Sequence, residues 1–147
     1  MQFAHMHLMV SDLQRSIDFY VTNFGFRHTG NEIIEPGRYI TDHWMPAGTE
    51  IAFVHDKDGA ELALEKTDKV EKMPAWFHFG FLLPTAAAVE KLYEDLKTRG
   101  VPLRKLSRKG DTIGFRCYDP DGYLLEFCCE PKRLRPTASA EEGVARA

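Results

Sequence analysis

The chain contains the same short pattern twice. Residues 4–12 read AHMHLMVSD and residues 77–85 read FHFGFLLPT; both are apolar runs with a histidine in second place and a helix-capping residue seven positions after it. Residues 56–64 and 119–127 share a second pattern, a D-x-D-G turn that leads into an apolar strand. A duplication of this kind restricts the fold to two similar units joined by a connector.

The first copy predicts a strand, a helix and three further strands. The helix is expected to begin at Ser11, which forms a capping box with Gln14, and to end at Gly25. Its apolar stripe recurs at helical spacing and consists of Leu13, Ile17, Tyr20 and Phe24. A strand over 50–54 then turns at the D-x-D-G sequence into a hairpin with residues 60–65. The unit is therefore βαβββ.

The second copy repeats this order. Its expected elements are a strand over 76–83, a helix from Thr85 to Gly100, a strand near 101–106 and a hairpin of 112–118 with 123–129. We place the first unit at residues 1–68 and the second at 69–132. Residues 133–147 are small, charged and without periodicity, so they are predicted to be a disordered tail. The fold class is α+β.

Composition excludes several classes of protein. The 147 residues are 44% hydrophobic and 28% charged, which is ordinary for a soluble globular chain. A net charge of −3 gives no pull toward nucleic acid or anionic membranes. No apolar run approaches the roughly 20 residues of a membrane helix, and the N-terminus does not read as a signal peptide. Three cysteines, two of them adjacent, form no disulfide framework, so we expect a reducing cytoplasm.

Over residues 1–130 the sequence resembles the vicinal-oxygen-chelate superfamily, which includes glyoxalase I, fosfomycin-resistance enzymes, extradiol dioxygenases and bleomycin-binding proteins. The resemblance rests on four segments, each of which is weak alone: His5, Asp12–Tyr20 with the closing Gly25-Phe26, His78–Phe81, and Asp119–Glu126. It implies paired βαβββ units that form open mixed sheets around a metal-binding cleft. It also implies a homodimer in which each site is assembled across the interface between subunits.

The resemblance implies three metal ligands in this chain. His5 and His78 occupy the equivalent histidine positions of the two copies, and Glu126 follows the second D-x-D-G turn. Two imidazoles and a carboxylate suit one divalent ion of Fe, Mn, Ni, Co or Zn, with other coordination positions left to water and substrate. A lone histidine in an apolar strand is more often structural, but two at matching repeat positions with a carboxylate favour a metal site.

The fourth ligand position is where the chain departs from glyoxalase I. That family has a glutamate or glutamine in the last strand of the first unit, and the turn register places Ala63 there. A methyl group cannot coordinate a metal. Glu61 and Glu65 share the face of Ala63, each about 6–7 Å along the strand. A bulge could bring one of them to the metal, Glu61 being the better candidate; without it the site has three protein ligands.

Two further residues are candidates for the site. His7 shares the strand face of His5, so it could act as a catalytic base or as a hydrogen-bond donor to substrate, or be a cleft histidine without a role. Arg116 precedes Glu126 by ten residues, where fosfomycin-resistance and extradiol enzymes place a tyrosine. Its guanidinium would suit a carboxylate or phosphate of the substrate, and the alternative is a surface arginine.

The resemblance implies a metal-dependent enzyme with glyoxalase-like lyase or isomerase chemistry on a small oxygenated substrate, with Glu126 as the base. Several alternatives remain open. An Fe(II)-dependent ring-cleaving dioxygenase is the runner-up, although the tyrosine missing at position 116 counts against it. A fosfomycin-type transfer of thiol or water is the third possibility, and the missing tyrosine counts against it too. A metal-free protein that binds a drug or toxin is the fourth, and three candidate ligands count against it.

Overall fold

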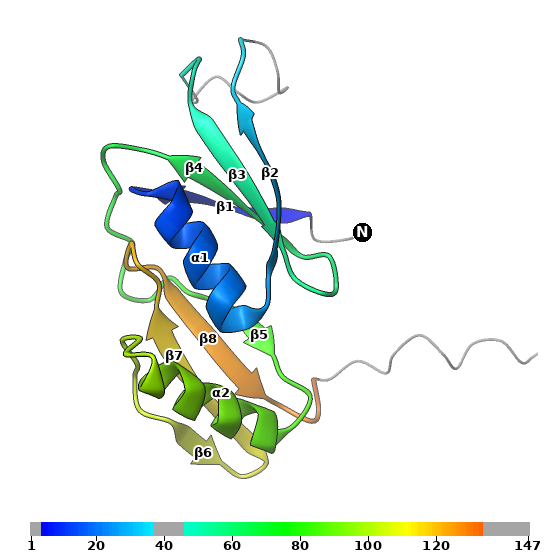
Figure 1. Cartoon of the computed structure of the whole chain (residues 1–147). Coiled ribbons are helices and arrows are strands. Elements are labelled where there is room, and N and C mark those ends of the chain that lie inside the picture. Colours follow the sequence, from blue (N-terminus) through cyan, green and yellow to red (C-terminus); the bar gives the residue numbers. More distant parts are fainter. Residues whose placement is uncertain (1–3, 37–45, 134–147) are drawn as a thin grey trace, which may run out of the picture. The chain divides into compact units, whose positions relative to one another are not determined.

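The computed structural model describes residues 4–36 and 46–133 (Figure 1). They form two compact units: the first contains residues up to Phe77 together with Tyr118–Tyr123, and the second contains His78–Cys117 and the chain from Leu124. Each unit is a four-stranded open mixed sheet with one helix, in the order strand, helix, strand, strand, strand. The predicted α+β fold of two βαβββ modules is therefore confirmed. The repeat boundary at residue 68 stays a prediction, and the predicted tail lies almost wholly outside the described residues.

The first unit is built on a sheet with the strand order β1-β4-β3-β2. Its elements are β1 (His5–Val10), α1 (Leu13–Phe24), β2 (Arg27–Ile33), β3 (Glu50–His55) and β4 (Glu61–Lys66). Strand β1 runs parallel to β4, and β3 is antiparallel to both of its neighbours. On β1, Leu8 and Val10 are buried, whereas His5, His7 and Met9 point to the other face of the sheet because side chains alternate along a strand.

Helix α1 begins at a different residue from the one expected. Its N-cap is Asp12, whose carboxylate accepts a hydrogen bond of 2.9 Å from the backbone N–H of Arg15. Ser11 is not the cap, because its N–H and hydroxyl both donate to Asp121. The predicted end is confirmed: Gly25 adopts φ +70°, a left-handed conformation that glycine accepts without strain.

The D-P-D-G turn, residues 119–122, forms hydrogen bonds and an ion pair with residues of and next to α1. Asp121 accepts hydrogen bonds from the hydroxyl groups of Ser11 and Ser16. It also forms an ion pair of 2.9 Å with Arg15. Asp119 is 5% exposed and accepts from the hydroxyl of Tyr20 at 3.0 Å. The repeated turn motif therefore has a structural task in the first unit, although it lies between two strands of the second.

The second unit has the strand order β5-β8-β7-β6. Its elements are β5 (Phe79–Leu82), α2 (Ala86–Thr98), β6 (Ser107–Lys109), β7 (Thr112–Tyr118) and β8 (Leu124–Cys129). The predicted strand near 101–106 is wrong; that segment contributes one isolated bridge from Leu103, and the paired strand comes later. Phe127 stacks between Phe81 and Phe115 at centroid distances of 5.3 and 5.5 Å, which fills the core face of this sheet.

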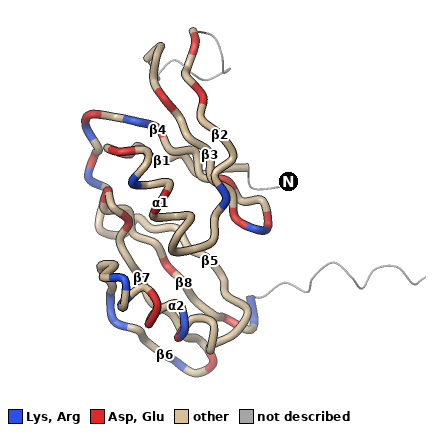
Figure 2. Tube along the Cα trace, in the orientation of Figure 1, with Lys and Arg blue, Asp and Glu red and all other residues tan. Residues whose placement is uncertain are grey.

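Charges of both signs are interspersed along both units (Figure 2). No helix within residues 4–36 and 46–133 is long and apolar enough to cross a membrane.

Candidate metal centre

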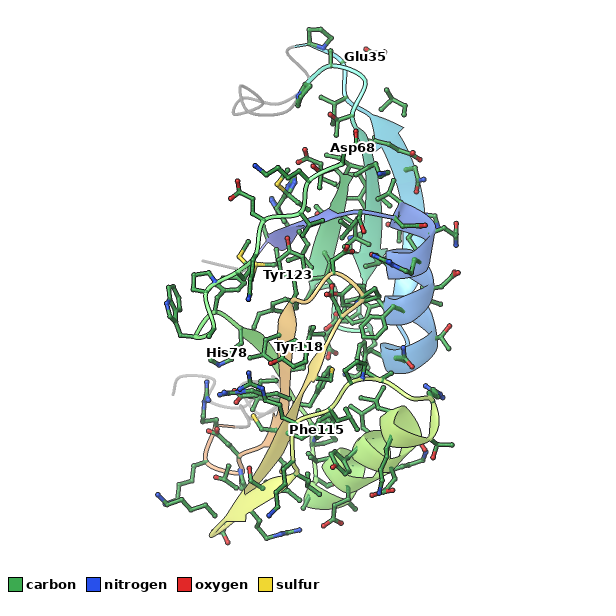
Figure 3. All side chains as sticks on the ribbon, turned by 90° about the vertical axis from the view of Figure 1, so that its left-hand side faces the viewer. Glu35, Asp68, His78, Phe115, Tyr118 and Tyr123 are labelled. Atoms are coloured by element: carbon green, nitrogen blue, oxygen red, sulfur yellow. The ribbon has the colours of Figure 1, made fainter. Side chains whose placement is uncertain are left out.

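In the second unit, two predicted ligands lie close together. His78 directly precedes β5, on the side of the sheet away from α2 (Figure 3). Glu126 is on β8, opposite Gly80 of β5, and its Oε2 lies 3.6 Å from Nε2 of His78. Two donor atoms bound to one ion at about 2.0–2.2 Å each can lie at most about 4.4 Å apart. The separation therefore fits a shared divalent ion, and the donor set of imidazole and carboxylate suits one.

Arg116 holds the other oxygen of this carboxylate. Its Nε and Nη2 atoms lie 2.9 and 2.7 Å from Oε1 of Glu126. Both side chains are about one-third exposed, at 36% and 31%, so the pair lies at the open face of the sheet. The guanidinium offsets the carboxylate charge and leaves Oε2 directed at His78. The sequence placed Arg116 in the site, but its direct bond to Glu126 was not foreseen.

Glycine keeps β5 close to Glu126. A Cβ atom at Gly80 would lie 3.1 Å from the carbonyl oxygen of Glu126 and 3.2 Å from its Cβ. Both contacts are tighter than ordinary van der Waals distances, so a larger residue would push the two strands apart. Position 80 thus helps to set where the Glu126 carboxylate lies.

Cys128 shares the face of Glu126, two residues further along β8. It is 8% exposed, and burial, followed by the nearby charges of Glu126 and Glu130, raises the pKa of its thiol. A raised pKa keeps the thiol protonated at neutral pH, and a protonated thiol is a poor nucleophile and metal ligand. Cys128 therefore behaves as a small buried side chain.

In the first unit, β1 and β4 align the remaining candidates. His5 is exposed and faces Glu61 across the parallel pair, while His7 faces Ala63. In the second unit Gly80 faces Glu126, and Gly80 follows its histidine by two residues, as His7 follows His5. The two registers therefore put Ala63 at the position equivalent to Glu126. Ala63 is 4% exposed and packs with Ile34, Ile51 and Phe53.

The two glutamates beside Ala63 each contact a histidine. Oε2 of Glu65 lies 2.7 Å from Nε2 of His7, and Oε2 of Glu61 lies 2.9 Å from Nε2 of His55. Glu65 is 2% exposed, whereas the side chain of His7 is 26% exposed, so the pair is buried on the glutamate side only. His55 was missed at the sequence level; its place on the same face as Glu61 follows only from the register of β3 with β4.

The structure does not bring the three predicted ligands into one cluster within a unit. Among the described residues, no group of three or more His, Cys, Asp or Glu side chains could hold a metal ion. His5 belongs to the first unit, and His78 and Glu126 belong to the second. The three-ligand site therefore stays a prediction. The proximity of His78 and Glu126 in the second unit supports it.

Comparison with known proteins identifies the family. A model described as the glyoxalase/bleomycin resistance protein/dioxygenase superfamily matches residues 2–127. The chain belongs to this superfamily. The resemblance found in the sequence is thereby confirmed. A search of curated proteins finds no match for the chain.

Solved structures of this superfamily share the fold. A possible glyoxalase from Bacillus cereus is 26% identical, with a TM-score of 0.67, and the match covers 88% of this chain and 99% of that one. The fosfomycin resistance protein FosX from Listeria monocytogenes is 17% identical, with a TM-score of 0.70 over 88% and 93%. A trypanothione-dependent glyoxalase I from Leishmania major is 20% identical, with a TM-score of 0.64 over 90% and 88%. The last two are too distant to indicate more than the fold.

Proposed function

We propose that this superfamily member is a divalent-metal-dependent lyase or isomerase with glyoxalase-like chemistry on a small oxygenated substrate. The observation that carries the proposal is the geometry around Glu126: its Oε2 faces His78 at 3.6 Å, and its Oε1 is held by Arg116. One carboxylate oxygen is thus held by a guanidinium, while the other lies beside a second atom that could bind the same ion.

His5, His78 and Glu126 would hold the ion, which is one of Fe, Mn, Ni, Co or Zn. Because the family resemblance implies sites assembled across a dimer, we propose a homodimer in which His5 of one subunit completes the site of its partner. The same superfamily includes FosX, a structure of which contains Mn(II). We place the protein in the cytoplasm.

The ion supplies Lewis-acid polarisation of adjacent substrate oxygens. The protein's part is to place a base and a binding group beside them. Glu126 moves a proton between neighbouring carbon atoms of the substrate. Arg116 uses only Nε and Nη2 on Glu126, so its Nη1 group retains N–H donors for an anionic group of the substrate. Arg116 also limits how far Glu126 can rotate, which keeps the base oriented.

Metal content and turnover test this proposal together. We expect about one ion per chain in the reconstituted wild type, anaerobic turnover of a thiol–2-oxoaldehyde adduct, and loss of both in His78→Ala and Glu126→Ala. The control is His28→Ala, which removes an exposed histidine that is paired with Asn31 in the first unit. If the wild-type protein bound no divalent ion, the enzyme proposal would be wrong, and a metal-free binding protein would be favoured instead.

A second candidate is a fosfomycin-type reaction, in which thiol or water opens an epoxide. Ala63 at the position equivalent to Glu126 favours it, because such sites have three protein ligands. Arg116 would suit a phosphonate, but it lies where fosfomycin-resistance enzymes place a tyrosine, which counts against this reaction. Product analysis with fosfomycin separates the two reactions, and stoichiometric oxygen uptake with a catechol would instead support the ring-cleaving dioxygenase.

A further inference from the structure

His7 lies on β1 two residues after His5, on the same face of the strand. Side chains at i and i+2 on one strand start about 6.6–6.8 Å apart. Imidazoles are long enough to converge on one ion from that separation. The side chain of His7 is 26% exposed, so it is reachable from the open face.

Glu65 fixes the orientation of this ring. The contact between its Oε2 and Nε2 of His7 is 2.7 Å long, and the Glu65 side chain is 3% exposed. A carboxylate accepts hydrogen bonds, so Nε2 donates and the neutral ring has its lone pair on Nδ1. Histidines that bind metals through one nitrogen commonly donate the other N–H to a carboxylate, which fixes the tautomer and the ring plane.

The two units repeat one geometric relation at this point. His78 contacts Glu126, and Glu126 is paired across the strands with Gly80, two residues after His78. Likewise, His7 contacts Glu65, and Glu65 is paired across the strands with Met9, two residues after His7. The register partner of His7 itself is Ala63, whose methyl group cannot compete with the imidazole for an ion.

We propose that His7 binds the metal through Nδ1, together with His5, and that buried Glu65 is the positioning residue that directs it. The inference rests on the proposed metal site, because the ion is the one shared with His78 and Glu126. It replaces the base expected at His7 with a ligand, since one lone pair on Nδ1 cannot serve both roles. It would give a chain with Ala63 a fourth protein ligand.

The test uses the full-length protein loaded with Cu(II), in which pulsed electron paramagnetic resonance counts coordinated imidazoles, and with Zn(II), for which competition titration gives the Kd. We expect three imidazoles in the wild type and two in His7→Ala, with a Kd at least about 100-fold weaker. Glu65→Gln should keep three imidazoles and weaken the Kd by roughly 10–100-fold, as found for other residues that orient a metal ligand.

His28→Ala is the control, because His28 is also a histidine of the first unit but is paired with the side chain of Asn31 and not with a candidate ligand. It should change neither the Kd nor the imidazole count. If His7→Ala fails to fold, His7→Gln removes the imidazole with less loss of volume and gives the same readout.

Two imidazoles in the wild type and a Kd within twofold in both His7 variants would overturn this inference. If His78→Ala still abolished binding in that case, the proposed enzyme would stand and His7 would return to the role of base. Wild-type protein without any bound ion would overturn the inference and the proposed function together.

Discussion

Asp119 shows how one buried carboxyl group makes the fold sensitive to pH. Burial raises its pKa from 3.8 to about 6, although hydrogen bonds from the Tyr123 N–H and the Tyr20 hydroxyl act in the opposite direction. The folded state therefore holds this proton more tightly than the unfolded chain. Its contribution to stability is complete below about pH 4 and is lost as the pH rises through about 6.

We predict that Asp119→Asn removes this dependence. Oδ1 of Asp119 accepts both backbone N–H groups, and the amide oxygen of asparagine can do the same. Between pH 4 and pH 7 the wild type should lose roughly 2–3 kcal/mol of unfolding free energy relative to the variant, at 1.36 kcal/mol for each pKa unit. Urea denaturation at four or five pH values measures it, and parallel pH profiles for the two proteins would contradict it.

The strands of the second unit approach closely at two glycines. A Cβ atom at Gly114 of β7 would lie 2.9 Å from Cβ of Cys128 and 3.0 Å from the carbonyl oxygen of Phe127. At Gly80 the distances to Cβ and to the carbonyl oxygen of Glu126 are 3.2 and 3.1 Å. The contacts at Gly114 are the shorter ones, and the atoms of β8 that they involve cannot move aside cheaply.

We therefore expect Gly114→Ala to destabilise the protein by about 1–3 kcal/mol, in spite of the smaller backbone entropy of alanine in the unfolded chain. Gly80→Ala should cost less stability, but it should weaken metal binding because it displaces Glu126. Chemical denaturation and metal titration of both variants check the order. Equal stability loss at the two sites would show that β5 and β8 are held as rigidly as β7 and β8.

At the scale of the whole molecule, the proposed site depends on which chain supplies His5. If sites form across a homodimer, a mixed dimer of His5→Ala and Glu126→Ala chains has one intact site and one with both defects. Refolding the two variants together should restore about a quarter of the wild-type metal content, because about half of the dimers are mixed. Each variant alone should restore none. Mixed samples that bind no more metal than either variant would place all the ligands in one chain.

The repeated sequence patterns were enough to predict the architecture. The stripe of α1 and its end at Gly25 were identified correctly, because hydrophobic periodicity and helix caps are local properties that neighbouring residues determine. The start of α1 was placed one residue too early. Ser11 and Asp12 are equally good caps in isolation, and the choice depends on Asp121, which is 110 residues from Ser11 in the sequence.

For the candidate site too, some features were predictable from the sequence and others were not. Residue type and repeat position, with the family resemblance, predicted His5, His78 and Glu126 as ligands, and the register of β1 with β4 agrees with the place given to Ala63. The side-chain contacts between these candidates could not be predicted from the sequence. Arg116 contacts Glu126, and Glu65 contacts His7 rather than replacing Ala63. Such contacts depend on strand register and side-chain rotamers, which arise from packing between residues distant in the chain, so only the tertiary structure determined them.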